Sequence, residues 1–388
     1  MKKFLALTLA LVMSLSLVAC GSKNEEPKTD DTNGTQVEEP TEGAYKIAMI
    51  TDYGDITDQS FNQTTYEACK AFAEDNSIEF NYFKPAGDNT ADRVAMIEKA
   101  VDEGYNVIVM PGYAFGGAIV ETAPKFSDVK FIALDVSAGD LGDGFEVPDN
   151  LYCAVYQEEL CGYMAGYAAV KMGYTKLGFL GGMAVPAVVR YGYGFVQGVD
   201  AAAAETGTEN VTLNYVYGGQ FFGDADITAV MDTWYQHDGV EVVFACGGGI
   251  YTSAVDAAKK ADAKVIGVDV DQAGVIANYA ETEGMTITSA MKGLYPTTYD
   301  TLSDVILNDN WSKYAGQIAT LGLVSADDPE ANYVQIPMGD GTQWCDTFTQ
   351  DDYKAMVKAM YDGELTVSND ITKSPADFAT CIAGEDPG

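Results

Sequence analysis

From Tyr45 onward the sequence alternates short apolar runs with amphipathic stretches, and this alternation constrains the fold more than any other feature. In a first block, about 46–150, it predicts strands and helices in turn. Runs rich in β-branched residues, separated by helices of about 10–15 residues, are typical of a parallel sheet with helices on both faces. The expected strands are 46–51, 78–83, 107–110 and 131–134, and the expected helices are about 61–75, about 92–103 and a segment from about 117.

The same alternation returns in a second block, about 175–290. Two such blocks predict an α/β fold in which two doubly wound parallel-sheet lobes surround a hinged cleft. The expected strands are 176–180, 213–216, 240–245 and 265–268, and the expected helices are 188–205, 226–237 and 250–260.

The segments around these blocks set the expected domain limits. A helix rich in small residues, about 158–172, joins the blocks, and a helix (296–307), a strand (near 333–336) and a helix (about 351–362) follow them. We expect residues 45–152 with about 289–320 to form a first lobe. The second lobe would then comprise 153–288 with about 321–388. Roughly 340 residues are enough for two separate cores.

The first residues carry an export signal. Lys2 and Lys3 precede an apolar run, 4–18, which ends in Ala19 and Cys20. This pattern predicts a lipoprotein signal peptide over 1–19 and acylation of Cys20, and two acyl chains hold a protein on a bilayer where one does not. A secretory signal with a chance cysteine and a transmembrane anchor are the alternatives, but the run is shorter than the ~20 residues that span a membrane.

Residues 21–44 are acidic and polar with almost no apolar side chains, so we expect a disordered tether between lipid and lobes. The protein would then lie at the extracytoplasmic face of the cell membrane. A formal net charge of -36 argues against nucleic-acid partners. A single histidine and the lack of a CxxC motif argue against a metal or redox cofactor, and Cys345 and Cys381 could form a disulfide that the sequence does not settle.

Ligands of doubly wound sheets meet the loops at the carboxyl ends of the strands. Phe61 follows the first such loop, and Phe221 and Phe222 lie in a loop of the second block. Asp135 and Asp269 each follow a strand directly, one in each block. Aromatic rings stack on planar ligands, carboxylates accept hydrogen bonds from hydroxyl or ring N–H groups, and glycines in these loops permit close approach. The loops therefore predict a site for an uncharged, planar, hydroxylated molecule.

Other functions fit the sequence less well. It contains neither GxGxxG nor GxxxxGK[ST], and its one histidine, His237, suggests no Ser-His-Asp arrangement. We therefore expect a binding protein rather than an enzyme. A receptor for a sugar or a sugar-like signal is the alternative, because sugars also stack on rings and bind aspartates.

At these loops the chain resembles the basic membrane protein family of lipoproteins, the PnrA-like nucleoside-binding proteins. The resemblance covers about residues 46–304. It departs at Tyr191 and Tyr193, where the family usually has phenylalanine, in the loop 113–115, and from about Trp311 onward. The shared motifs are DQSFNQ (58–63), EELCGYMAG (158–166), GFLGGMAVPAVVRY (178–191), FGD (222–224), ACGG (245–248), GVDVDQ (267–272) and TSAMK (288–292).

This resemblance implies a type I periplasmic-binding-protein fold and delivery of purine nucleosides, such as inosine, guanosine and adenosine, to an ABC permease. It implies that Phe61 and Phe222 enclose the base, with Phe221 as a substitute for Phe222. Asn62, Asp135 and Gly248 would contact base or sugar, Asp269 would hold the ribose hydroxyls, and Lys292 would bond the ligand. The full set of expected ligand-binding residues is Asp58, Phe61, Asn62, Tyr113, Asp135, Met183, Phe222, Gly248, Asp269 and Lys292.

Overall fold

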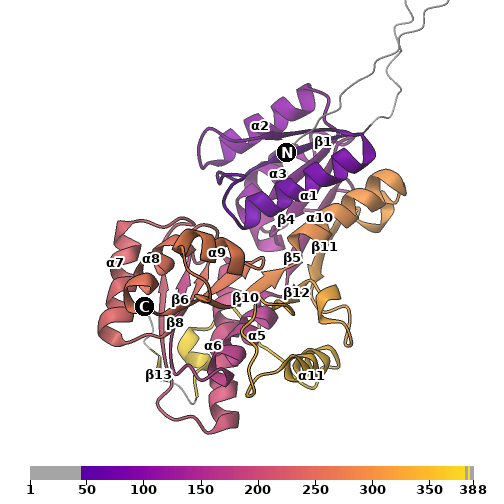
Figure 1. The fold of residues 1–388 in the computed structure, drawn as a ribbon. Helices are drawn as coiled ribbons and strands as arrows, with labels where there is room; N and C mark the ends of the chain where they lie inside the picture. The colour runs from indigo at the N-terminus through magenta and orange to yellow at the C-terminus, as the bar shows by residue number, and fades with distance from the viewer. Residues whose placement is uncertain (1–44, 381–382, 385–388) are drawn as a thin grey trace, which may run out of the picture. The chain divides into compact units, whose positions relative to one another are not determined.

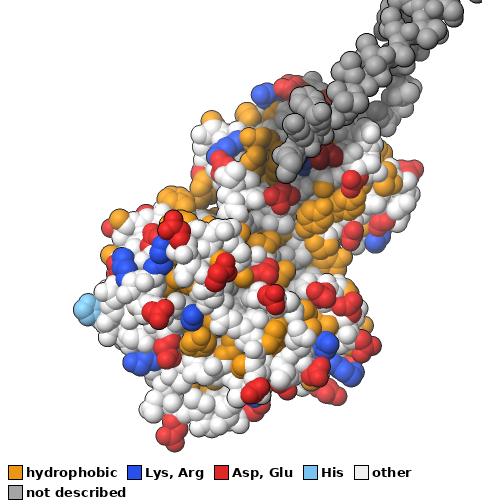
Figure 2. All heavy atoms as spheres, viewed as in Figure 1, with side chains coloured by type: hydrophobic (Ala, Val, Ile, Leu, Met, Phe, Trp, Pro, Cys, Tyr) orange, Lys and Arg blue, Asp and Glu red, His pale blue; other side chains and the backbone are white. Residues whose placement is uncertain are grey.

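A computed structural model describes residues 45–380 and 383–384. The predicted signal peptide, the acylation at Cys20, the tether and the pairing of Cys345 with Cys381 all involve residues outside these ranges. Acidic side chains are scattered over the visible face of the protein (Figure 2), as the net charge of the sequence requires.

The first sheet contains six parallel strands in the order β11-β5-β4-β3-β1-β2. Side chains of adjacent strand residues point to opposite faces. Ile47 and Met49 accordingly enter the core beneath one layer of helices, and Ala48 and Ile50 enter the core beneath the other. The strands are β1 (Lys46–Ile50), β2 (Glu79–Phe83), β3 (Val107–Pro111), β4 (Lys130–Leu134), β5 (Leu151–Tyr156) and β11 (Gln317–Leu321).

The second sheet contains seven strands in the order β12-β10-β9-β8-β6-β7-β13. All of its pairings are parallel except that of β12 with β10. The strands are β6 (Lys176–Gly181), β7 (Thr212–Tyr217), β8 (Val242–Cys246), β9 (Lys264–Asp269), β10 (Thr286–Lys292), β12 (Val334–Gln335) and β13 (Ala383–Gly384).

Helices cover both faces of each sheet (Figure 1). The first sheet lies between α1 (Phe61–Asn76) with α10 (Leu294–Leu302) and α2 (Thr90–Asp102) with α3 (Gly116–Thr122). The second sheet lies between one pair, α5 (Glu158–Lys171) and α6 (Pro186–Thr206), and three helices on the other face, α7 (Ala225–Thr233), α8 (Tyr251–Ala261) and α9 (Ala273–Ala280). The short α4 (Ala138–Leu141) follows β4, and α11 (Gln350–Tyr361) packs near α5. The predicted fold class is confirmed.

The helices α5 and α6 pack with their backbones in close approach. A Cβ atom on Gly194 of α6 would overlap the carbonyl oxygen of Glu159 on α5, and one on Gly162 of α5 would overlap that of Tyr191. Glycines therefore set the separation of the two helices, because any side chain at these positions would push them apart.

Four strands, β5, β10, β11 and β13, were absent from the expected set. The first three are next to points where the chain passes from one sheet to the other. In β10 the buried residues include Thr286, Thr288 and Ser289, so the strand lacks the apolar run that marks the others. The expected lobe limits stay a prediction. In the part of the chain that the structure describes, no helix is both long and apolar enough to cross a membrane.

Candidate functional site

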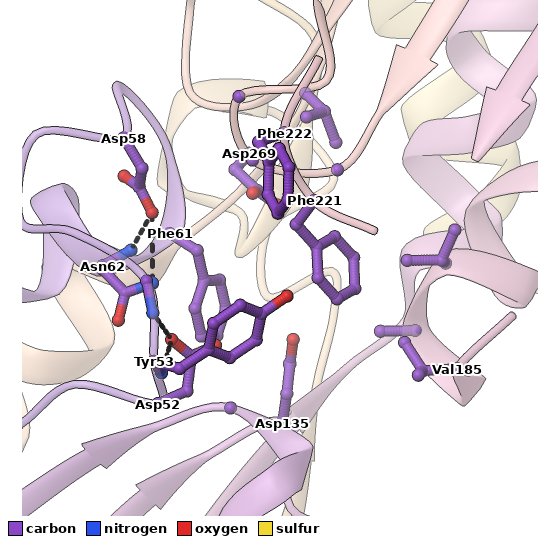
Figure 3. Close-up of a pocket in the computed structure, with 18 of the residues that line it drawn as sticks. Asp52, Tyr53, Asp58, Phe61, Asn62, Asp135, Val185, Phe221, Phe222 and Asp269 are labelled. Atoms are coloured by element: carbon purple, nitrogen blue, oxygen red, sulfur yellow. Dashed lines mark hydrogen bonds between the residues drawn. The ribbon is translucent and has the colours of Figure 1, made fainter. Parts of the chain in front are cut away.

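A cavity of about 440 Å³ lies between the carboxyl ends of strands from the two sheets. Nine of the ten expected ligand-binding residues line it. Met183 is the exception: its sulfur accepts a hydrogen bond of 3.8 Å from the Tyr113 hydroxyl, which does line the cavity. Figure 3 shows rings and carboxylates facing the same space.

Asp58 shapes the start of α1 and holds Asn62 in place (Figure 3). Its carboxylate accepts the backbone N–H groups of Ser60, Asn62 and Gln63 at 2.9, 2.9 and 3.1 Å. It also accepts the Asn62 side-chain N–H at 3.1 Å, and the Asn62 Oδ1 atom is buried with no partner among the described residues. Burial raises the pKa of Asp58, although these hydrogen bonds oppose the shift. Asp58 thus fixes the orientation of the Asn62 side chain and leaves its Oδ1 atom without a partner among the described residues.

Asp135 and Asp269 enter the cavity through the same backbone conformation. Asp135 directly follows β4 and Asp269 is the last residue of β9, and both have positive φ angles, 59° and 65°, which aspartate tolerates better than most residues. The Asp269 carboxylate accepts the Ser60 hydroxyl at 2.5 Å and the Tyr191 hydroxyl at 3.3 Å, so it joins the two sheets. The Oδ1 atom of Asp135 is buried with no partner in the described part of the chain. Two residues of the cavity wall, Asn62 and Asp135, thus each carry a buried acceptor oxygen without a partner among the described residues.

Lys292 lies at the centre of the polar network. Its Nζ atom is 2.5 Å from Asp135, 3.5 Å from Glu158 and 3.8 Å from Asp269. Burial opposes the charge of Lys292, but the three carboxylates outweigh it and raise its pKa. The ammonium also lies 4.8 Å from the centre of the Phe61 ring. Lys292 is therefore charged and committed to carboxylates, which leaves little attraction for a phosphate.

Two acidic residues at the start of α5 extend this network. The carboxylate of Glu158 is fully buried and accepts a 2.6 Å hydrogen bond from Arg190 of α6. Burial raises its pKa, and Arg190 and Lys292 partly offset that effect. Glu159 is also buried, and its Oε2 atom has no partner among the described residues. Burial raises the pKa of Glu159 to about 7. Glu159 thus takes up a proton near neutral pH.

Replacing Glu159 by glutamine is expected to change the pH dependence of stability. The folded protein keeps a proton on Glu159 that the unfolded chain releases above about pH 4.5, so the free energy of unfolding falls as the pH rises toward 7. Glu159→Gln should remove about 2–3 kcal/mol of this loss, and the variant should be the more stable protein at pH 8 but not at pH 4.5. Urea unfolding of both proteins across this pH range measures the difference. If the unfolding free energies of the two proteins change with pH in the same way, the raised pKa of Glu159 is contradicted.

Aromatic rings reach the cavity from both sheets. Phe61 comes from the start of α1, whereas Phe221 and Phe222 come from the loop after β7. The Phe221 ring packs over the backbone of Gly182 and Gly247, where a Cβ atom would overlap it. Phe222 is 52% exposed. Of the two, Phe221 is the ring with a fixed position.

Several residues of the site were not expected from the sequence. Asp52 and Tyr53 line the cavity. They lie in the loop that follows β1, one residue beyond its end, so the rule that ligands meet the loops at the carboxyl ends of strands could have predicted them. Ser60 directly precedes α1, and its hydroxyl donates to Asp269 rather than accepting a backbone N–H group of the helix. Arg190 and Glu158 are distant in sequence. The one signal for a buried cation was that two acidic residues, Glu158 and Glu159, begin the otherwise apolar helix α5. No cluster of histidine, cysteine and acidic residues suited to a metal occurs among the residues described.

Comparison with known proteins identifies what this architecture is similar to. A family model described as "ABC transporter substrate-binding protein PnrA-like" matches residues 45–327. The ABC transporter nucleoside-binding protein BmpA of Lactococcus lactis subsp. cremoris is 26% identical over 285 residues, which cover 70% of this chain and 75% of the relative. The CD4+ T-cell-stimulating antigen of Listeria innocua is 29% identical, with 75% and 80% covered.

Solved structures support the fold. A solute-binding protein of an ABC transporter system from Aeropyrum pernix K1 superposes with a TM-score of 0.64 at 20% identity, covering 86% of this chain and 90% of that chain. At this identity the match shows the fold alone, and it agrees with the expected type I periplasmic-binding-protein architecture.

Proposed function

The chain belongs to the PnrA-like family of ABC transporter substrate-binding proteins, and we propose that it captures purine nucleosides in its cavity and passes them unchanged to a membrane permease. The expected family resemblance is confirmed. Inosine, guanosine and adenosine are the proposed ligands. Acylated Cys20 would keep the protein at the membrane, beside the permease.

The observation that carries the proposal is the pairing of aromatic rings with unpaired acceptors in one cavity. Phe61 and Phe221 offer flat apolar surfaces to a base, from opposite sheets. Asn62 and Asp135 offer buried oxygens to N–H or hydroxyl donors. Stacking on an aromatic side chain contributes about 1–3 kcal/mol per base. A ligand with a planar base and a donor-rich sugar satisfies both features, whereas a sugar alone offers the rings only its C–H faces.

The charge of the network supports a nucleoside over a nucleotide. Asp135, Glu158 and Asp269 carry three negative charges when ionised, and Lys292 and Arg190 carry two positive charges. A phosphate in this cavity would add negative charge where the cations are already paired, and that arrangement is unfavourable at low dielectric.

Calorimetric titration of the purified protein with inosine, guanosine, adenosine, cytidine and ribose tests the proposal. Phe61→Ala is expected to weaken nucleoside binding by about 1–3 kcal/mol, because it removes one stacking surface. Phe126→Ala is the matched control, since Phe126 is also partly buried but lies outside the cavity; it should leave the affinity unchanged.

The remaining outcomes distinguish other functions. Binding of ribose as tight as that of inosine would favour the sugar receptor, and sub-micromolar binding of no nucleoside would refute the proposal. Nucleoside recovered intact after long incubation is expected; release of free base would indicate an enzyme.

A further inference from the structure

The cavity wall is rich in acceptors and poor in free donors. Asp52, Asp58, Asp135, Asp269 and Asn62 all contribute oxygens. A nucleoside base, however, also carries atoms that can only accept, such as ring nitrogens and carbonyl oxygens, and each of these needs a donor when it is buried.

Most side-chain donors at the cavity are already committed. Lys292 donates to Asp135 and Glu158, and the Tyr113 hydroxyl donates to the Met183 sulfur. Thr57 and Lys84 both donate to Asp55. Tyr53 differs from them, because its hydroxyl makes no hydrogen bond with any described residue.

The backbone holds Tyr53 in a fixed position. The N–H groups of Tyr53 and Gly54 each donate to the Asp52 carboxylate at 2.6 Å, and Arg93 donates to the Asp52 carbonyl at 3.2 Å. The phenol extends from this turn into the cavity (Figure 3). Burial, followed by the charge of Asp52, raises the pKa of Tyr53 to about 12, so the hydroxyl keeps its proton at neutral pH.

We propose that Tyr53 is a specificity-determining residue, whose hydroxyl donates a hydrogen bond to an acceptor atom of the nucleoside base. The assignment to the base follows from complementarity: ribose hydroxyls carry donors of their own and suit the unpaired oxygens of Asn62 and Asp135. The atoms of a nucleoside that can only accept are the ribose ring oxygen and the ring nitrogens and carbonyl oxygens of the base, and the base atoms are the stronger acceptors. The inference rests on the proposed function and adds a base-reading group to it.

Tyr53→Phe tests the inference, since it removes the hydroxyl and retains the ring. Inosine binding to the full protein should weaken by roughly two- to tenfold, the usual effect of one uncharged hydrogen bond. Displacement of inosine by ribose, corrected for the inosine affinity of each protein, should give the same ribose affinity in both. Tyr82→Phe, a phenol deletion on the exposed strand β2, should bind inosine as the natural protein does.

The outcomes separate this inference from the proposed function. Unchanged inosine affinity in Tyr53→Phe, with matching thermal unfolding, would overturn the role of the hydroxyl. Equal weakening of ribose would overturn its assignment to the base. If ribose displaces inosine from neither protein, the inosine affinities of Tyr53→Phe and the natural protein decide whether the hydroxyl contributes to binding. Failure of the natural protein to bind any nucleoside would overturn the proposed function, and this inference with it.

Discussion

Lys292→Met is expected to lower the free energy of unfolding at pH 7 by about 3–5 kcal/mol, the usual effect of removing one partner of a buried ion pair. Lys292 is 5% exposed and holds three carboxylates within 4 Å. Methionine retains most of the side-chain volume, so the loss reports charge rather than packing. Without the ammonium, the like charges of the largely buried Asp135 and Asp269 are no longer compensated by Lys292.

The pH dependence of the unfolding free energy of Lys292→Met shows whether charge or packing causes the loss of stability. Carboxylates left without their cation bind protons more tightly when folded than when unfolded, so the variant should regain stability as the pH falls toward 5. Urea unfolding at pH 5 and pH 7 measures this. Lys358→Met is the matched control, because Lys358 pairs with Asp362 on the surface of α11 and should leave the unfolding free energy nearly unchanged. A loss that is equal at both pH values would show that packing, not charge, governs the position.

The sequence predicted the parts of the site that depend on local rules. Asp135 and Asp269 were expected because each directly follows an apolar strand, and parallel strands present their carboxyl ends at one edge of a sheet. Phe61 was expected because it opens a helix after such a loop. The alternation of apolar runs and amphipathic helices likewise predicted most elements of both sheets within a few residues.

The parts that the sequence did not predict depend on long-range contacts. Ser60 meets Asp269 at a separation of 209 residues, and no local pattern reports such a pairing. Arg190 meets Glu158 only because α5 and α6 pack closely. Strand β10 buries Thr286, Thr288 and Ser289 and ends at Lys292 of the site, so it lacks the apolar run by which the other strands were predicted. Local sequence propensity predicts a strand poorly where the buried positions of that strand hold polar residues that serve the site.

Gly194→Ala is expected to cost about 3 kcal/mol of stability, although alanine is by about 1 kcal/mol the better helix former. Its Cβ atom would overlap the Glu159 carbonyl of α5, and a backbone atom cannot move aside as a flexible side chain can. Relief therefore requires α5 and α6 to separate. Because Glu158 and Arg190 form their ion pair across the two helices, separation should also loosen the network that holds Lys292 and so weaken the proposed binding of nucleosides. Gly274→Ala, on α9 with open space around the new atom, should be neutral or stabilising. Urea unfolding compares the two variants, and equal stabilities would refute the view that glycine sets the spacing of these helices.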